Sequence, residues 1–128
     1  MERRMIRIVL DAKDNVGNVF VKTERIIRET KTTYTLREIS ALCAEDDDDQ
    51  FDHELRKSEY NFNEISYSYT SLDEDYPYLA IYWGIIEDQN SDIAALIEDV
   101  IAEMKRSLIK QFEDHIKMVQ SRLDMIKN

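Results

Sequence analysis

Cysteine, proline and glycine are scarce in this chain of 128 residues, which has one, one and two of them. The single cysteine, Cys43, excludes an internal disulfide and a cysteine-rich metal site, and it suits a reducing compartment. The shortage of glycine and proline argues against a disordered, collagen-like or loop-rich all-β chain. Gly17 and Gly84 stand alone, which excludes a glycine-rich phosphate-binding loop. We therefore expect regular elements joined by short polar connections.

Long hydrophobic runs are also missing. The longest one, Tyr78 to Ile86, has nine residues, whereas a helix needs roughly 20 to span a bilayer. The basic N-terminal segment has no apolar run longer than three residues, too short for the core of a signal peptide. These features predict a soluble, cytoplasmic protein with no membrane partner.

Basic residues are nearly absent between Ala41 and Asp99, where 17 acidic residues meet only two basic ones and leave a formal charge of −15. The whole chain has a net charge of −10. This balance argues against direct binding to nucleic acid, because such proteins neutralise phosphates with lysine and arginine. The negative charge predicts that the partner is a basic protein surface, and this surface can belong to a nucleic-acid-binding enzyme. The alternative is that the negative charge serves only to keep the protein soluble.

The first 35 residues carry a β pattern. Apolar residues alternate from Ile6 to Leu10, which is typical of a strand with one face inward. Lys13 to Asn18 is a turn signal, with Gly17 or Asn18 able to adopt positive φ. Val19 to Ile27 is expected to pair with the first strand, and threonine-rich Thr32 to Thr35 to add a third.

A helical pattern begins at Thr35. Thr35 and Glu38 have the spacing of a capping box, and Leu36 and Ile39 start an apolar face at helical intervals. Farther on, Phe51 to Leu55 fits either a short second helix or an acidic loop that enters one. We therefore expect short helices, with an acidic run, over residues 36–58.

The last third of the chain predicts a strand pair and a long helix. Ile65 to Thr70 alternates as a half-buried strand, and Tyr78 to Ile86, apolar on both faces, should be the central and best-buried strand. Ser91 is the expected N-cap of a helix that contains no glycine or proline to the end of the chain. Its apolar residues recur every 3.6 residues on average, which indicates a straight amphipathic helix and not a strict heptad coiled coil.

These segments together predict one α+β domain over residues 1–128. Its small, mostly antiparallel sheet would have four to five strands. The parts would be N-terminal strands over 1–35, short helices over 36–58, a strand hairpin over 64–87 and one long amphipathic helix over 91–127.

The predicted helix is about 50 Å long, more than a small sheet can cover. Its C-terminal part would then project, bend back or bind a partner. We expect a homodimer with C2 symmetry and antiparallel or crossed helices, unless one helix packs across the whole sheet. The candidate self-association residues are Phe112, Ile116, Val119, Leu123 and Ile126.

No motif predicts catalysis, a cofactor or a metal site. A calcium loop that starts at Asp48 would place His53 where the EF-hand requires glycine. A metal-dependent hydrolase built from Asp46 to Glu54 is a remote alternative. His53 and His115 lack a motif that pairs them with a nucleophile.

Several tyrosines lie among carboxylates in the sequence, and this pattern indicates a binding surface, because such side chains favour interfaces with arginine- or lysine-rich partners. Tyr67, Tyr69, Tyr82 and Trp83 are expected mostly in the core, and the acidic, aromatic surface lies elsewhere. The candidate partner-binding residues are Asp46, Asp47, Asp48, Asp49, Asp52, Glu54, Asp73, Glu74, Asp75, Tyr76 and Tyr78.

The sequence thus predicts a non-catalytic acidic protein-binding module. Its sharpest version is an inhibitor of the phage or mobile-element anti-defence type, whose carboxylates mimic nucleic-acid phosphates and occupy the basic site of a nucleic-acid-handling protein. The alternative is a dimeric structural, assembly or chaperone-like protein that uses the long C-terminal helix.

Overall fold

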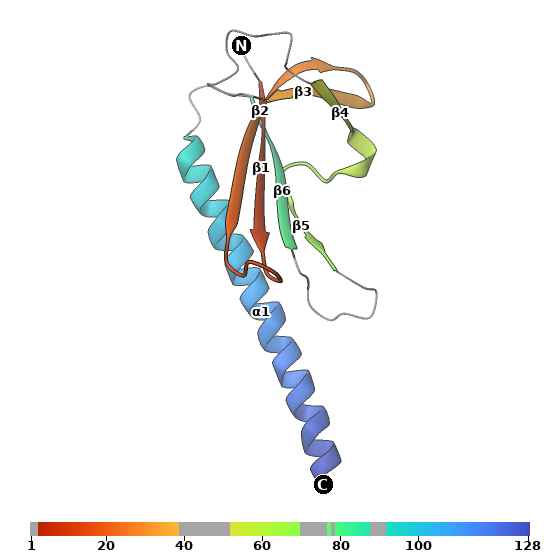
Figure 1. Ribbon diagram of the computed structural model, residues 1–128, viewed down its shortest axis with the longest axis vertical. Helices are drawn as coiled ribbons and strands as arrows, with labels where there is room; N and C mark the ends of the chain where they lie inside the picture. Colours follow the sequence, from red (N-terminus) through yellow and green to blue (C-terminus); the bar gives the residue numbers. More distant parts are fainter. Residues whose placement is uncertain (1–2, 39–51, 70–76, 78, 88–91) are drawn as a thin grey trace.

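The computed structural model describes residues 3–38, 52–69, 77, 79–87 and 92–128. These residues form a curled antiparallel sheet of six strands and one long helix, so the protein has an α+β fold (Figure 1). The strands are β1 (Arg4–Asp11), β2 (Val19–Glu29), β3 (Thr33–Glu38), β4 (Asp52–Arg56), β5 (Ile65–Ser68) and β6 (Leu79–Ile86). A 3-10 turn, η2 (Lys57–Glu59), follows β4, and the helix is α1 (Ile93–Lys127).

The strand order is β4-β3-β2-β1-β6-β5, and every neighbouring pair is antiparallel. β1 and β2 form the expected hairpin, and Gly17 adopts the positive φ of 90° that its turn requires. The Asp11 carboxylate stabilises this turn by accepting hydrogen bonds from the backbone amides of Lys13, Asp14 and Asn15. These bonds hold the pKa of Asp11 below its ordinary value.

The sheet has a hydrophobic core on each face. On the face that α1 covers, Ile6, Ile8 and Leu10 of β1 pack with Val100, Met104 and Leu108 of the helix. On the opposite face, Met5, Tyr34, Leu36 and Leu55 form a second cluster, which Trp83 and Ile85 extend. Because successive side chains of a strand alternate between faces, both β1 and β6 supply both cores, which explains the apolar runs in these strands.

The expectation of short helices over residues 36–58 was wrong for most of the described part of this segment, which forms strands, and only its end enters the short 3-10 helix η2. Leu36 lies in β3 and Leu55 in β4, and the Oγ1 atom of Thr35 has no hydrogen-bond partner among the described residues. Tyr34 and Leu36 alternate inward and pair with Leu55 and His53, so the period is two and not 3.6. Strand β4 is also the reason that the sheet exceeds the expected four to five strands.

Two further expectations also need correction. The best-buried strand is β1, which lies between β2 and β6, whereas β6 alternates between buried and half-buried residues. The N-cap of α1 is Asp92 and not Ser91, because the Asp92 carboxylate accepts a hydrogen bond of 3.0 Å from the amide of Ala95.

Helix α1 crosses one face of the sheet obliquely, and its C-terminal half extends well past the strands (Figure 1). Its 35 residues correspond to a length of about 52 Å. Its buried residues are Val100, Met104 and Leu108, all in the first half. Among the described residues, no helix is apolar enough over a sufficient length to cross a membrane.

Candidate functional site

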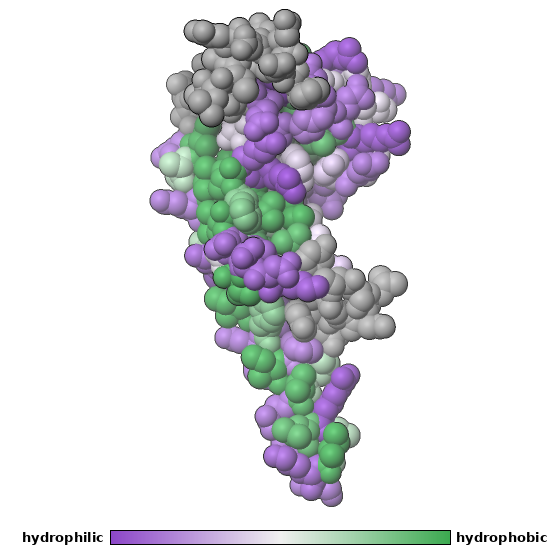
Figure 2. Space-filling view, in the orientation of Figure 1, coloured by the Kyte–Doolittle hydropathy of each residue, from purple (hydrophilic) through white to green (hydrophobic). Residues whose placement is uncertain are grey.

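The free half of α1 exposes a row of large apolar side chains. Ile109, Ile116, Val119, Leu123 and Ile126 are between 41% and 83% exposed. Figure 2 shows hydrophobic residues continuing along the helix from the sheet to its free end. Large contiguous apolar surfaces of this kind mark sites of protein–protein contact.

This row follows a strict heptad. Ile109, Phe112, Ile116, Val119, Leu123 and Ile126 are separated by 3, 4, 3, 4 and 3 residues. That spacing places them at the a and d positions of a coiled coil, with isoleucine or leucine at every a position. We call these six residues the heptad seam. The interval of 3.6 residues predicted for the whole helix is thus an average over two different stripes.

The two stripes lie on different sides of the helix. Val100, Met104 and Leu108 recur every four residues and are buried against the sheet. Ile109 is 56% exposed although its neighbour Leu108 is buried, so the seam begins on a different side of the helix. Phe112 packs at the edge of the helix-side core and marks the transition.

Of the candidate self-association residues, four are exposed and one, Phe112, is half-buried. The candidate residues from the sequence did not include Ile109. The heptad spacing identifies Ile109 as a member of the seam, and this spacing is clear when the residues that contact the sheet are left out of the pattern.

The candidate acidic surface is described only in part. Asp46 to Asp49, Asp73 to Tyr76 and Tyr78 lie outside the described residues. Asp52 and Glu54 are exposed residues of β4, and their side chains lie on the face of the strand opposite to buried Leu55.

Both β4 carboxylates interact with arginines of the same sheet. Asp52 accepts hydrogen bonds of 2.8 and 3.2 Å from Arg37, which hold the pKa of its carboxyl below the ordinary value. Glu54 lies 3.8 Å from the guanidinium of Arg28. A basic partner would therefore have to compete with arginines already in place at these two positions.

A second acidic surface, which the sequence did not single out, lies between β5 and α1. This groove of about 520 Å³ has Tyr67 and Tyr82 in its lining and carboxylates at Glu64, Asp99 and Glu103. Within the described part of the chain, no cation lies within ion-pair distance of Glu64 or Asp99. Glu103 pairs with Arg106 on the next helical turn. The groove combines aromatic surface with negative charge, which suits an arginine or lysine side chain.

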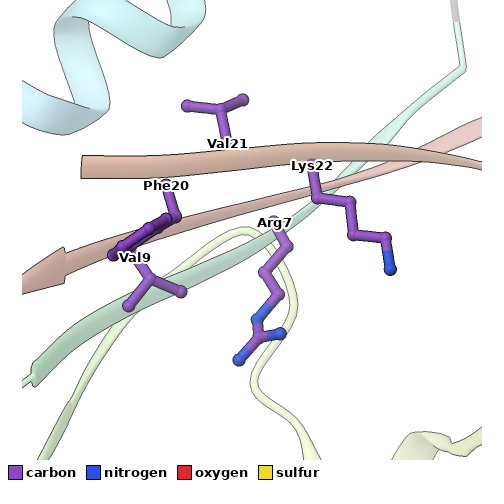
Figure 3. Close-up of a pocket in the computed structure, with 5 residues that line it drawn as sticks. All are labelled: Arg7, Val9, Phe20, Val21 and Lys22. Carbon is purple, nitrogen blue, oxygen red and sulfur yellow. The ribbon is translucent and has the colours of Figure 1, made fainter.

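A recess of about 410 Å³ involves β1 and β2 and is lined by Arg7, Val9, Phe20, Val21 and Lys22. Figure 3 shows Arg7, Val9, Phe20 and Lys22 pointing away from α1, and Val21 pointing towards it. The guanidinium of Arg7 lies 5.2 Å from the centre of the Trp83 ring. Two cations beside apolar side chains suit a partly apolar anion.

A buried carboxylate lies near this recess. Glu24, on β2, is only 2% exposed and contacts His53 Nε2 of β4, while Lys22 Nζ lies 3.9 Å away. Burial of a carboxylate is costly unless donors satisfy it, so this contact links β4 to the middle of the sheet. His53 therefore has a structural partner, and it lies on β4, a segment that the sequence analysis had assigned to a helix or loop.

A charged cluster surrounds Tyr34 on the same face. Glu29 accepts hydrogen bonds from Lys57, at 2.5 Å, and from Arg3. These bonds lower the pKa of Glu29, with Lys57 as the larger cause. Lys57 Nζ also lies 4.6 Å from the centre of the Tyr34 ring. Among the described residues, no group of three or more potential metal ligands comes together.

Comparison with protein-family models found no match, and comparisons with curated proteins and with solved structures found none.

Proposed function

We propose that this protein is a non-catalytic assembly module that forms a homodimer through the heptad seam of α1. The observation that carries the proposal is the row of large apolar side chains, spaced as a and d positions, on a helix that extends past its own sheet. Full burial of one such side chain stabilises an interface by about 1.5–3 kcal/mol. The seam offers several from each copy.

The stability of the free half of α1 is a second reason to expect a partner. A helix gains most of its stability from packing of an apolar face, and isolated helical segments are marginal in water. Met104 and Leu108 supply such packing in the first half, and the exposed seam would obtain it from another chain.

The test is the oligomeric state of the full chain and two matched variants, measured by analytical ultracentrifugation over a range of concentrations. Ile116→Glu with Leu123→Glu places two charges in the seam and should yield monomers. Ser121→Glu with Met125→Glu adds the same charge on the same helix outside the seam and should leave the dimer intact.

Far-UV circular dichroism of each variant checks that the sheet and the first half of α1 remain folded. A monomeric wild-type chain at about 100 µM, or a seam variant that still dimerises, would contradict the proposal.

The groove between β5 and α1 supports a second candidate function, binding of a basic partner as an acidic inhibitor. Two of its carboxylates, Asp99 and Glu103, belong to helix α1, and a mimic of nucleic-acid phosphates needs carboxylates on such a rigid element. Capture of a nucleic-acid-binding protein from lysate should then be lost at high salt, because salt screens exposed charges. It should also be lost in Glu64→Lys with Asp99→Lys, and unchanged in the seam variant.

A further inference from the structure

We infer that the two copies pair through antiparallel helices in one register, with Ile116 of each copy facing Val119 of the other. This inference rests on the proposed function and adds the orientation and alignment of the partner. Three observations support it. Two concern the free half of α1, namely the order of its apolar residues and the placement of its charges. The third is the negative charge of the rest of the domain.

Two copies of the heptad seam can pack against each other when the helices run in opposite directions. In an antiparallel coiled coil, a positions pack against d positions of the partner. When Ile116 faces Val119 of the second copy, Ile109 faces Ile126 and Phe112 faces Leu123. All six seam residues of each chain then have a partner, and the overlap from 109 to 126 spans about 26 Å.

The open end of the seam allows this overlap. The end of the partner's helix would lie beside Ile109, which follows Leu108, the last buried residue of α1. Ile109 is exposed, so this part of the helix surface is accessible to a second chain.

Charges beside the seam disfavour the parallel alternative. A parallel pair would place Arg122, at a g position, against Lys127 of the partner, at the following e position, and would do so twice. The antiparallel register removes that contact and brings Lys127 within about 8 Å, measured along the axis, of Glu113 in the partner. The partner's Arg106 lies about 3 Å from Lys127 along the axis, and its charge is already offset by its ion pair with Glu103.

The charge of the whole domain points in the same direction. The segment from 41 to 99 carries a formal charge of −15, and a parallel pair would hold two such domains at the same end. An antiparallel pair separates them. It also directs the basic end of each helix, with Arg122 and Lys127, toward the partner's first helical half, which contains Glu98, Asp99 and Glu103.

Distances between spin labels test the orientation directly. Single cysteines would replace Lys110, Lys117 and Asp124, one at a time, in a Cys43→Ser background. All three lie at b positions away from the seam. In the inferred register the two labels of a dimer are offset along the axis by about 22, 2 and 20 Å at these positions. The shortest distance is therefore expected at position 117.

The possible results separate orientation from dimerisation. A minimum at 117 with clearly longer distances at 110 and 124 supports the inference. Nearly equal distances at all three positions indicate parallel helices and overturn it, while leaving the proposed dimer in place. A minimum at another position overturns the register. Absence of dipolar coupling, together with monomers in ultracentrifugation, overturns both the inference and the proposed function.

Discussion

The ring of Tyr82 lies directly over Gly84, two residues along β6 on the same face. A Cβ atom added at Gly84 would come within 2.5 Å of the Tyr82 Cε1 atom and 3.0 Å of its hydroxyl oxygen. Tyr82 is 7% exposed and belongs to the core beneath α1. Gly84 therefore makes room for an aromatic ring on the face that positions the helix.

Gly84→Ala should lower the free energy of unfolding by about 1–2 kcal/mol, because the buried ring must move aside. Chemical denaturation of the single variants and of the double variant with Tyr82→Leu measures this coupling. In the Tyr82→Leu background the alanine should be neutral or slightly stabilising, since it lowers the entropy of the unfolded chain. An equal cost in both backgrounds would contradict the role assigned to the ring.

His53→Ala should destabilise the protein by about 1–3 kcal/mol, because it removes a hydrogen-bond partner from the buried carboxylate of Glu24. His53→Gln is the matched control, since its amide can still donate a hydrogen bond, and it should cost clearly less. Equilibrium denaturation in urea provides both values. Equal losses for alanine and glutamine would show that Glu24 does not depend on this donor.

Acid should weaken the protein through Glu29. Its pKa is lowered in the folded state by Lys57 and Arg3, so the unfolded chain binds more protons as the pH falls past the ordinary value near 4.5. The stabilisation is fully present above that value and is lost as the pH falls through the lower, folded-state pKa.

As the pH falls over the same range, protonation also relieves the repulsion among the many acidic residues, and this effect stabilises the protein. The wild type is therefore compared with variants that differ by one carboxylate. The free energy of unfolding of the wild type should fall more steeply between about pH 5 and 3 than that of Glu29→Gln. Glu59→Gln, which removes an exposed charge, should retain the wild-type slope. Parallel curves for wild type and Glu29→Gln would refute the assignment.

A chain that ends at Lys110 should keep its sheet and become monomeric. The buried helix residues Val100, Met104 and Leu108 precede the cut, and all of the heptad seam except Ile109 follows it. Partial loss of stability is expected because Phe112 leaves the edge of the core. Circular dichroism and ultracentrifugation would test this, and a truncated chain that still dimerises would place the interface on the sheet.

Tyr69 shows how far pattern reasoning extends in this protein. Its alternation with Tyr67 predicted a place in the core, yet Tyr69 is exposed and its hydroxyl lies 3.4 Å from Gln111 of α1. Tyr82, expected in the core by the same reasoning, is buried there. Period alone assigns a side chain to a face, whereas its position relative to the end of the strand decides how deeply it is buried.

Local pattern determined the β1–β2 hairpin, β5, β6 and the long helix, because in these segments one period dominates and turn residues such as Gly17 mark the ends. Only tertiary structure decided that Leu36 and Leu55 belong to strands. The apolar residues around them fit the strand period of two and the helix period of 3.6, and pairing between strands selects the strand. Tertiary structure also decided where α1 leaves the sheet. That boundary separates two apolar stripes of α1, which the average interval of 3.6 residues over the whole helix does not distinguish. The sequence cannot show it, because burial depends on what lies opposite each residue and not on its neighbours in the chain.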